Sequence, residues 1–279
     1  MSRPDEDAGT NAIAAARLDV ALVAAGLLPS RTRAAKAIEA GRVSVDGHRA
    51  TRASAPVAAG ATLRLVADPA DKYVGRAAHK LIGALDTFPD VVVQGRLALD
   101  AGASTGGFTQ VLLERGAARV LAVDVGHGQL HPTVAGDPRV ENREGVNVRD
   151  LTDASVPGGV DLVVGDLSFI SLRLVIDSLA RVTRPGGELL LMVKPQFEVG
   201  RGRVGRTGVV TDPQARQDAV GGVVQAARDA GLELRGAARS PLPGQDGNVE
   251  FFLHLRRSRD GETAPVDDAE RIVAALTYS

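Results

Sequence analysis

The sequence predicts an α/β fold, in which helices cover both faces of a mostly parallel sheet and a small α+β unit precedes this sheet in the chain. Three observations support this fold class. Apolar runs of strand length alternate with helical patterns through the second part of the 279-residue chain. A turn with three glycines joins the first of these runs, residues 97–100, to a helical pattern. The length suits one large domain or two smaller ones.

The composition excludes several classes of protein. Hydrophobic residues make up 44% of the chain and aromatic residues 3%, so the core must be aliphatic. The absence of cysteine excludes disulfides, thiolate zinc sites and a cysteine nucleophile. No apolar run approaches the roughly 18 residues that span a bilayer, and the polar residues 1–12 predict a disordered tail rather than a secretory signal. We therefore expect a cytoplasmic protein with no membrane partner, and a monomer by default.

A small domain is predicted over residues 13–66. Its first helical pattern ends at Gly26, and its second begins after Ser30, a favoured N-cap residue, and ends at Gly41. The D-G pair Asp46–Gly47 between β-prone runs indicates a hairpin. The domain should therefore combine two helices with a small sheet.

This small domain is strongly basic and resembles a known module. Residues 17–66 hold eight basic and three acidic side chains, a net charge of +5, which suits a phosphate backbone, although a solvated helix face is the alternative. The pattern S-R-x-x-A-x-x-x-I-x-x-G-x-V-x-V-D-G at residues 30–47 resembles the RNA-binding module of the ribosomal-protein S-four type. The candidate RNA-binding residues here are Arg17, Arg31, Arg33, Lys36 and Arg42.

Alternating patterns continue through the rest of the chain. Helical spacing over Arg76–Phe88 places Lys80 off the apolar stripe, so spacing alone gives this lysine no role. Strands are predicted at 97–100, 120–124, 161–166 and 188–194, with an edge or antiparallel strand at 249–255, and helices at 172–182 and 214–230. The predicted boundaries are 67–76 for a linker, 77–257 for the second domain and 258–279 for a tail with a helix at 267–276.

The glycine turn indicates a nucleotide-type ligand. Its spacing, G-x-S-x-G-G, is neither the G-x-G-x-x-G of dinucleotide enzymes nor a P-loop. Asp100 before the turn suits a ligand with an ammonium group, such as S-adenosylmethionine, and Asp124 about twenty residues on suits ribose hydroxyls. A tight turn that binds no ligand is the alternative. The candidate cofactor-binding residues are Asp100, Gly102, Ser104, Gly106, Gly107, Phe108, Asp124 and Asp150.

Charged residues end four of the predicted strands. Asp100, Asp124, Asp166 and Lys194 each follow an apolar run. Ligands bind at the carboxyl edge of open parallel sheets, so these four side chains should share one rim. Any one aspartate there could instead be a helix N-cap, but the four together favour a site.

Six segments carry a second resemblance, which spans nearly the whole chain. They are K-Y-V-G-R-A-A-H-K-L (72–81), L-D-A-G-A-S-T-G-G-F-T (99–109), A-V-D-V-G-H-G-Q-L (122–130), D-L-S-F-I-S-L (166–172), V-K-P-Q-F-E-V-G (193–200) and S-P-L-P-G-Q-D-G-N-V-E-F-F (240–252). The chain resembles the FtsJ-like ribose 2′-O-methyltransferases and, more closely, the TlyA (haemolysin A) family. It departs from the family pattern at Gly75, Ala77, His127 and His131–Pro132.

The resemblance implies a catalytic tetrad and its chemistry. It places Lys80, Asp166, Lys194 and Glu250 together. Lys194 would act as base towards a ribose 2′-hydroxyl once a second cation and partial burial disfavour its charged form, while the two carboxylates orient the ammonium groups. Much of the rate would come from in-line positioning of nucleophile and methyl donor, and the reaction needs no metal.

A basic loop follows the tetrad lysine. The segment R-G-R-V-G-R, residues 201–206, brings three arginines among glycines, and either phosphate contact or simple solvation explains it. His79 is expected on the surface. The candidate RNA-binding residues of this loop are Arg201, Arg203 and Arg206.

Together these patterns predict a Rossmann-like, S-adenosylmethionine-dependent methyltransferase sheet with a small N-terminal α+β RNA-binding domain. The resemblance implies 2′-O-methylation of ribose, in cytidine of 16S and/or 23S ribosomal RNA, with ribosomal RNA or subunits as partners. Two alternatives stay open. One is an RNA-binding ribosome assembly factor with a vestigial methyltransferase fold. The other is a membrane-active haemolysin, which would need an amphipathic or apolar insertion segment that the sequence lacks.

Overall fold

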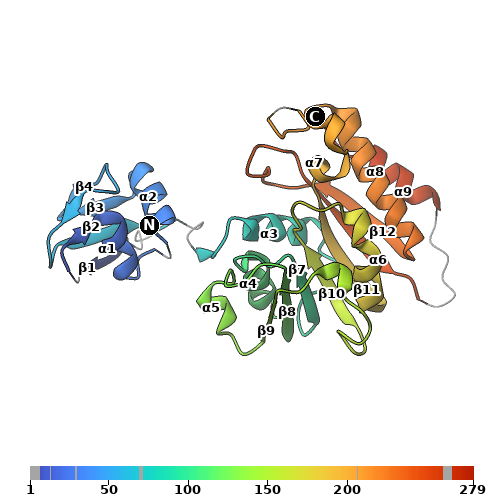
Figure 1. Ribbon diagram of the computed structural model, residues 1–279, viewed down its shortest axis with the longest axis horizontal. Helices are drawn as coiled ribbons and strands as arrows, with labels where there is room; N and C mark the ends of the chain where they lie inside the picture. Colours follow the sequence, from blue (N-terminus) through green and yellow to red (C-terminus); the bar gives the residue numbers. More distant parts are fainter. Residues whose placement is uncertain (1–6, 13, 29, 69–71, 206, 260–265) are drawn as a thin grey trace, which may run out of the picture. The chain divides into compact units, whose positions relative to one another are not determined.

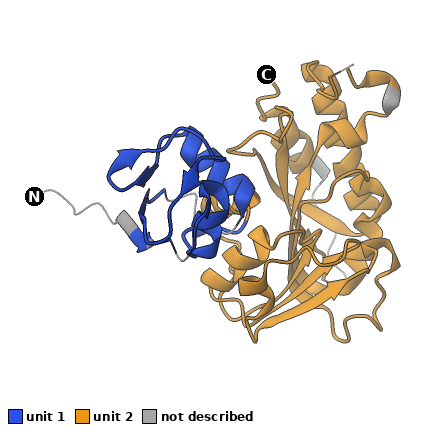
Figure 2. Ribbon diagram, turned by 60° about the vertical axis from the view of Figure 1, so that its left-hand side comes forward, with its two compact units in different colours: residues 1–74 blue, residues 75–279 orange. Residues whose placement is uncertain are grey.

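The structure, a computed structural model, describes residues 7–12, 14–28, 30–68, 72–205, 207–259 and 266–279. The chain divides into two compact units, Met1–Val74 and Gly75–Ser279 (Figure 2). Each unit has a core of its own and is described by itself.

The N-terminal unit packs two helices against a small sheet. Its four-stranded sheet has the order β1-β6-β3-β4, with β1 Asp7–Asn11, β3 Val43–Val45, β4 His48–Arg49 and β6 Thr62–Val66, and β2 Ala16–Arg17 pairs with β5 Pro56–Val57. The helices are α1 Leu18–Ala24 and α2 Arg31–Glu39. Their core is aliphatic, as the composition predicts, and includes Leu18, Leu22, Ala37, Ile38 and Leu63.

Local signals in this unit act as the sequence predicts. The Ser30 side chain accepts a hydrogen bond from the backbone N–H of Arg33 and so caps α2. Gly41 follows α2 and has a φ of +73°, a backbone conformation that residues with a Cβ atom rarely adopt. Asp46 and Gly47 both have positive φ and form the tight turn between β3 and β4.

The start of the chain departs from the prediction. Residues 7–11 form β1, which pairs antiparallel with β6 from Asp7↔Val66 to Asn11↔Thr62. The predicted disordered tail is therefore wrong for residues 7–11, while residues 1–6 lie outside the described part of the chain. Backbone hydrogen bonds hold this strand to the sheet, and such bonds require no apolar alternation in the sequence.

A seven-stranded sheet forms the centre of the second unit (Figure 1). Its strands are β7 Leu97–Ala101, β8 Arg119–Asp124, β9 Val140–Glu144, β10 Val160–Gly165, β11 Thr183–Val193, β12 Leu232–Arg239 and β13 Phe251–Arg257. The spatial order is β12-β13-β11-β10-β7-β8-β9. The five strands from β11 to β9 are parallel, and β13 runs antiparallel to both of its neighbours.

Helices cover both faces of this sheet, which confirms the predicted α/β fold class. They are α3 Ala77–Thr87, α4 Gly107–Glu114, α5 Pro132–Ala135, α6 Ile176–Val182, α7 Pro195–Glu198, α8 Pro213–Asp229 and α9 Val266–Ala274, with short 3₁₀ turns η2 Val148–Asp150, η3 Leu172–Leu174 and η4 Arg201–Arg203. Helices α3 and α4 pack together on one side of the sheet, and α6, α8 and α9 lie on the other (Figure 1).

The order of the strands creates the crevice in which ligands bind. From β7 the chain moves outward through β8 and β9, then returns to place β10 on the other side of β7. At such a switch point the loops after the two central strands diverge and leave room at the carboxyl edge. The ends of β7 and β10 meet there, because Ala101 pairs with Gly165.

Two strands of the seven-stranded sheet are absent from the sequence prediction. The strands β9 and β12 are the two edge strands of the sheet, and both carry several charged residues, so neither has a clear apolar alternation. The stretch predicted as an edge or antiparallel strand becomes β13, which is antiparallel but lies inside the sheet. Among the described residues, the structure has no helix with the length and apolar character needed to cross a membrane.

Candidate active site at the carboxyl edge of the sheet

Four charged side chains gather where β10 and β11 end and β13 begins. Asp166 directly follows β10, and Lys194 directly follows β11. Glu250 directly precedes the antiparallel β13, and the last pair of the β11–β13 ladder is Val193↔Phe251. One step further along this ladder, Lys194 and Glu250 are therefore neighbours. Of the four residues that the strand ends predict on one rim, Asp166 and Lys194 meet at this position.

The first ion pair of the site joins Lys194 to Asp166. The Lys194 Nζ lies 2.7 Å from Asp166 Oδ1 and donates a hydrogen bond of 2.6 Å to Ser168 Oγ. The Lys194 side chain is 9% exposed and that of Asp166 15%, so solvent screens this pair only partly. Ser168 is a further site residue, and the sequence analysis assigned it no role.

The second ion pair joins Lys80 on α3 to Glu250. Lys80 Nζ lies 2.5 Å from Glu250 Oε2 and 3.8 Å from the sulfur of Met192. The side chains of Lys80 and Glu250 are 7% and 2% exposed, so both charges are out of water. Helical spacing alone gives Lys80 no role, and only the family resemblance predicts that it lies in the site. The spacing does not show that α3 also packs over the polar end of β11 and β13.

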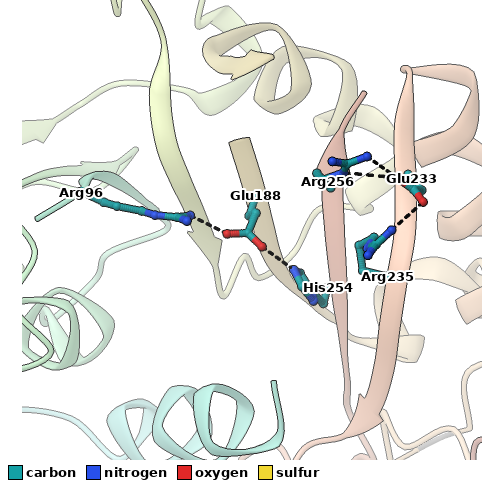
Figure 3. Close-up of polar contacts among 6 residues, drawn as sticks. All are labelled: Arg96, Glu188, Glu233, Arg235, His254 and Arg256. Carbon is teal, nitrogen blue, oxygen red and sulfur yellow. Dashed lines mark hydrogen bonds and ion pairs between the residues drawn. The ribbon is translucent and has the colours of Figure 1, made fainter. Parts of the chain in front are cut away.

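A further polar network lies on the same face of the sheet, away from its carboxyl edge (Figure 3). Glu188 Oε2 pairs with Arg96 Nη1 at 2.5 Å, and Glu188 Oε1 lies 3.0 Å from His254 Nε2. Burial opposes ionisation of Glu188, but the hydrogen bonds from His254 and Arg96 outweigh it and lower the pKa of this carboxyl. On β12, Glu233 likewise joins Arg235 and Arg256. These contacts hold the strands together.

The glycine turn is shaped by close contacts within the protein itself. Gly102 has a φ of +84°, and a Cβ there would lie 3.3 Å from the carbonyl oxygen of Asp166. Gly106 caps α4 at a φ of +93°, and a Cβ there would lie 2.8 Å from Leu130. A Cβ on Gly107 would lie 3.1 Å from the backbone nitrogen of Ala78. The three glycines therefore let other segments of the chain pack directly against the turn. The sequence analysis explained these glycines only by the close approach of a ligand.

Asp124 and Glu144 fix the loops on either side of the crevice. The Asp124 carboxylate accepts hydrogen bonds from the backbone N–H groups of Ser104 and Gly126, at 2.8 and 2.7 Å. Glu144 at the end of β9 accepts three more, from residues 128–130. These bonds, that from Gly128 above all, lower the pKa of Glu144. The sequence does not reveal this role of Glu144, because the residue lies at the end of β9, a strand without a clear apolar pattern.

Asp100 is buried below the glycine turn with one oxygen left without a partner. Its Oδ2 accepts a hydrogen bond of 2.6 Å from Thr109, while Oδ1 has no hydrogen-bond partner. Burial raises the pKa of this carboxyl to about 7. A buried, unsatisfied carboxylate oxygen is unfavourable alone and favourable beside an ammonium group. This observation fits the ammonium group of S-adenosylmethionine.

The affinity for S-adenosylmethionine should therefore depend on pH. An ammonium group binds the ionised form of Asp100, so at pH values below about 7 binding must release a proton. Between pH 5 and 6 we expect the association constant to rise about tenfold, and above pH 7 to level off, measured by calorimetry. The variant Asp100→Asn should bind weakly and without this slope. A wild-type affinity independent of pH over this range would contradict the assignment.

The remaining candidate cofactor-binding residues differ in their exposure to solvent. Ser104 has a φ of +47° and lies exposed at the crevice, with its N–H directed to Asp124. Phe108 is buried, and its ring stacks on Phe252 with centroids 6.3 Å apart. Asp150 lies exposed in η2, beyond the end of β9.

A cleft opens next to the Lys194–Asp166 pair. It has a volume of about 520 Å³, and its lining includes Phe169, Gln196, Phe197, Gly205 and Gly208. Phe169 is 92% exposed at a φ of +64°, with its ring 5.3 Å from that of Phe197. An exposed aromatic ring beside a cleft suits a planar base. The sequence analysis did not single out this ring, although it lies in the segment D-L-S-F.

Two candidate RNA-binding residues of the N-terminal unit, Arg17 and Arg31, lie around one buried acid. Arg17 and Arg31 both donate hydrogen bonds to Asp19, which is 4% exposed. The hydrogen bond from Arg17, together with that from Arg31, outweighs burial and lowers the pKa of Asp19. The two guanidinium groups are thus held in place while their side chains stay 53% and 60% exposed.

The other basic candidates are distributed over both units. Lys36 is exposed on α2, and Arg33 lies half-buried on the same helix. Arg42 pairs with Asp68 at 3.7 Å. In the basic loop, the Arg203 side chain forms a 2.8 Å ion pair with Asp218. The side chain of Arg201 and all of Arg206 lie outside the described residues.

Comparisons with known proteins agree with this division into two units. The S4 domain family matches residues 16–63, and the FtsJ-like methyltransferase family matches residues 73–257. A solved Streptococcus thermophilus structure that carries a hemolysin name has a TM-score of 0.71 and 35% identity, and covers 94% of this chain and 96% of that one.

Two relatives carry names that state an activity. A Mycobacterium tuberculosis protein named 16S/23S rRNA (cytidine-2′-O)-methyltransferase TlyA is 50% identical over 245 residues, 88% of this chain and 91% of that protein. A Campylobacter jejuni protein named 23S rRNA (cytidine-2′-O)-methyltransferase TlyA is 35% identical over 186 residues, 65% of this chain and 70% of that one. With these matches over most of its length, the chain belongs to the TlyA group of FtsJ-like methyltransferases.

Proposed function

We propose that this protein transfers a methyl group from S-adenosylmethionine to the 2′-oxygen of a cytidine ribose in 16S and/or 23S ribosomal RNA. One observation carries the proposal: two buried lysine–carboxylate pairs, Lys194–Asp166 and Lys80–Glu250, flank the carboxyl edge of the sheet beside the glycine turn. The target nucleotide is taken from the names of the Mycobacterium tuberculosis and Campylobacter jejuni relatives.

The crevice at the glycine turn would hold the methyl donor. Asp100 offers an unpartnered oxygen to its ammonium group, and Asp124 at the end of β8 offers a carboxylate to its ribose hydroxyls. Glu144 keeps the loop after Asp124 in place through three backbone N–H groups. S-adenosylmethionine, when bound, supplies a methyl group on a positively charged sulfur, which an oxygen nucleophile attacks in line.

Lys194 is the proposed general base. A ribose hydroxyl is a weak nucleophile until its proton begins to leave, and Lys194 Nζ accepts that proton. Only a neutral amine can accept a proton, so this role requires Lys194 to be neutral when the hydroxyl attacks. Asp166 and Ser168 hold Nζ in one position, through contacts of 2.7 and 2.6 Å. Holding the base in the right position next to the hydroxyl should contribute much of the increase in the rate of methyl transfer.

Lys80 and Glu250 form the second half of the site. Both side chains are almost fully buried, so their mutual attraction is stronger than that of a surface pair. Lys194 directly follows Val193, and Glu250 directly precedes Phe251. Val193 and Phe251 form the last pair of the β11–β13 ladder, so the two ion pairs lie at the same end of these strands. All four residues belong to one copy of the chain, so the proposed tetrad takes no side chain from a second subunit.

The N-terminal unit would supply the affinity for RNA. It matches the S4 domain, and Arg17, Arg31, Arg33 and Lys36 lie on or beside its two helices. The cleft at Phe169 would receive the base of the target nucleotide. An unpaired base can stack on such an aromatic ring.

Removing charge from α2 should weaken RNA binding in a salt-dependent way. Each phosphate contact contributes roughly 0.7–0.9 to the slope of log K against log salt. The double variant Arg33→Gln/Lys36→Gln should therefore lower the slope by roughly 1.4–1.8, measured by filter binding of ribosomal RNA. Arg115→Gln, which breaks a surface pair with Asp86, is the control and should leave the slope unchanged. An unaltered slope in the double variant would remove these residues from the RNA interface.

Methyl transfer to purified ribosomal subunits tests the proposed function. Small and large subunits are incubated separately with S-adenosylmethionine labelled on the methyl group, and protein and RNA fractions are then counted. Label in the RNA of at least one subunit supports the proposal. Binding of the donor and the RNA with no label in either subunit would instead favour the assembly factor with a vestigial methyltransferase fold.

A further inference from the structure

One wall of the cleft beside the active site is a segment without helix or strand. Residues 207–211 run between the basic loop and α8, and Gly208 lines the cleft next to Phe169 and Phe197. Val210 in the same segment is 1% exposed. The backbone of such a buried, irregular segment needs hydrogen-bond partners from elsewhere in the chain.

The buried side chain of Asn248 supplies two of these partners. Its Oδ1 accepts a 2.9 Å hydrogen bond from the Val210 N–H, and its Nδ2 donates one of 3.0 Å to the Gly208 carbonyl. Asn248 is 1% exposed, so its amide must be satisfied within the protein. It lies two residues before Glu250, and its own carbonyl accepts a hydrogen bond from Gly244. The cleft wall is thus tied to the strand that carries Glu250.

Arg216 on α8 supplies the third partner. Its Nε donates a 2.9 Å hydrogen bond to the Val210 carbonyl, and its Nη1 donates one of 2.6 Å to the Tyr278 carbonyl. Arg216 is 7% exposed, and burying a guanidinium group is costly unless it is well paired. Both backbone groups of Val210 are therefore held by buried side chains, and the same arginine links the cleft wall to the residues that follow α9.

We propose that Asn248 and Arg216 are positioning residues that clamp residues 207–211 as the wall of the RNA-binding cleft, with the Tyr278 carbonyl completing the clamp. The inference rests on the proposed function, because it assigns the cleft to the RNA substrate. A fixed wall in the cleft that Phe169 also lines leaves less conformational freedom to be lost when a nucleotide enters. The clamp should therefore act on RNA affinity. Binding of the methyl donor, on the other side of the site, should not depend on it.

The test compares Asn248→Ala with a matched control in the whole protein. Thr183→Val also removes a buried side-chain hydrogen bond to backbone, but at the other end of β11, where Thr183 donates to Leu179. With two hydrogen bonds lost, we expect Asn248→Ala to raise the KM for ribosomal subunits roughly tenfold. Its kcat and its affinity for S-adenosylmethionine should stay near the wild-type values. Asn248→Asp keeps the acceptor for Val210 but not the donor, and should give an intermediate KM.

Limited trypsin digestion measures the clamp independently of activity. Cleavage after Arg203, a few residues before the clamped segment, should accelerate in Asn248→Ala and in Arg216→Gln but not in Thr183→Val. Because both side chains hold Val210, the double variant should raise KM by less than the product of the single effects.

Two results would overturn the clamp. The first is a KM and a cleavage rate of Asn248→Ala that equal those of the control Thr183→Val. The second is a loss of donor affinity in step with the rise in KM, which would indicate general unfolding of the second unit. If the wild-type protein labels neither subunit, the function proposed above fails, and the digestion experiment still decides whether the clamp exists.

Discussion

Lys194→Ala should lower the rate of methyl transfer at saturating donor and RNA by about 10²- to 10⁴-fold, the usual contribution of a general base. Lys194 Nζ contacts both Asp166 and Ser168, so the substitution removes the proposed base from the site. The proposed donor contacts, Asp100 and Asp124, are not altered, so we expect donor binding to be unchanged. Single-turnover kinetics with labelled donor, beside calorimetry of donor binding, measure both quantities.

The variant Lys194→Arg distinguishes the role of Lys194 as a base from its role in the ion pair with Asp166. An arginine keeps the positive charge next to Asp166 but stays protonated, so it cannot accept the ribose proton. We expect this variant to be nearly as inactive as the alanine variant and to fold as well as the wild type. Substantial activity in Lys194→Arg would show that the charge, and not proton transfer, is what the site requires.

Glu250→Ala should destabilise the second unit by about 3–5 kcal/mol, because it leaves the buried Lys80 ammonium without its partner. The distance of 2.5 Å and side-chain exposures of 7% and 2% distinguish this pair from a surface ion pair. A surface pair would contribute only about 0–1 kcal/mol. Urea unfolding followed by circular dichroism measures the difference, and a loss below 1 kcal/mol would contradict the burial of the pair.

A double variant shows whether the pair serves stability or chemistry. Lys80→Met/Glu250→Leu replaces both charges by apolar side chains of similar size, a change that is often neutral or stabilising. We expect this variant to regain the stability lost in Glu250→Ala and to stay inactive in methyl transfer. A stable and fully active double variant would remove Lys80 and Glu250 from the catalytic site.

The sequence was most informative where local chemistry determines structure. The apolar runs place β7, β8, β10 and β11, and the ends of these strands place Asp166 and Lys194 at one rim, because parallel strands present their carboxyl ends together. Ser30 and Gly41 bound α2 for reasons that involve only their near neighbours. Such signals need no knowledge of the fold.

Contacts between distant segments could not be predicted in this way. Lys80 and Glu250 are 170 positions apart, and helical periodicity alone gives the lysine no role. Resemblance to a family, and not spacing, placed both in the site. Glu144 and Asn248 bind backbone groups, which carry no side-chain signature at the other end of the bond. The charged edge strands β9 and β12 pair through their backbones and were missed for the same reason.

The position of the transferred methyl group tests the central claim most directly. Ribosomal RNA labelled by the wild-type protein is digested to nucleosides, and the labelled nucleoside is identified by chromatography and mass spectrometry. If the two lysine–carboxylate pairs activate a ribose hydroxyl, the label must appear in 2′-O-methylcytidine and disappear with Lys194→Ala. Label on a base, or 2′-O-methylcytidine formed equally well by Lys194→Ala, would contradict this account of the site.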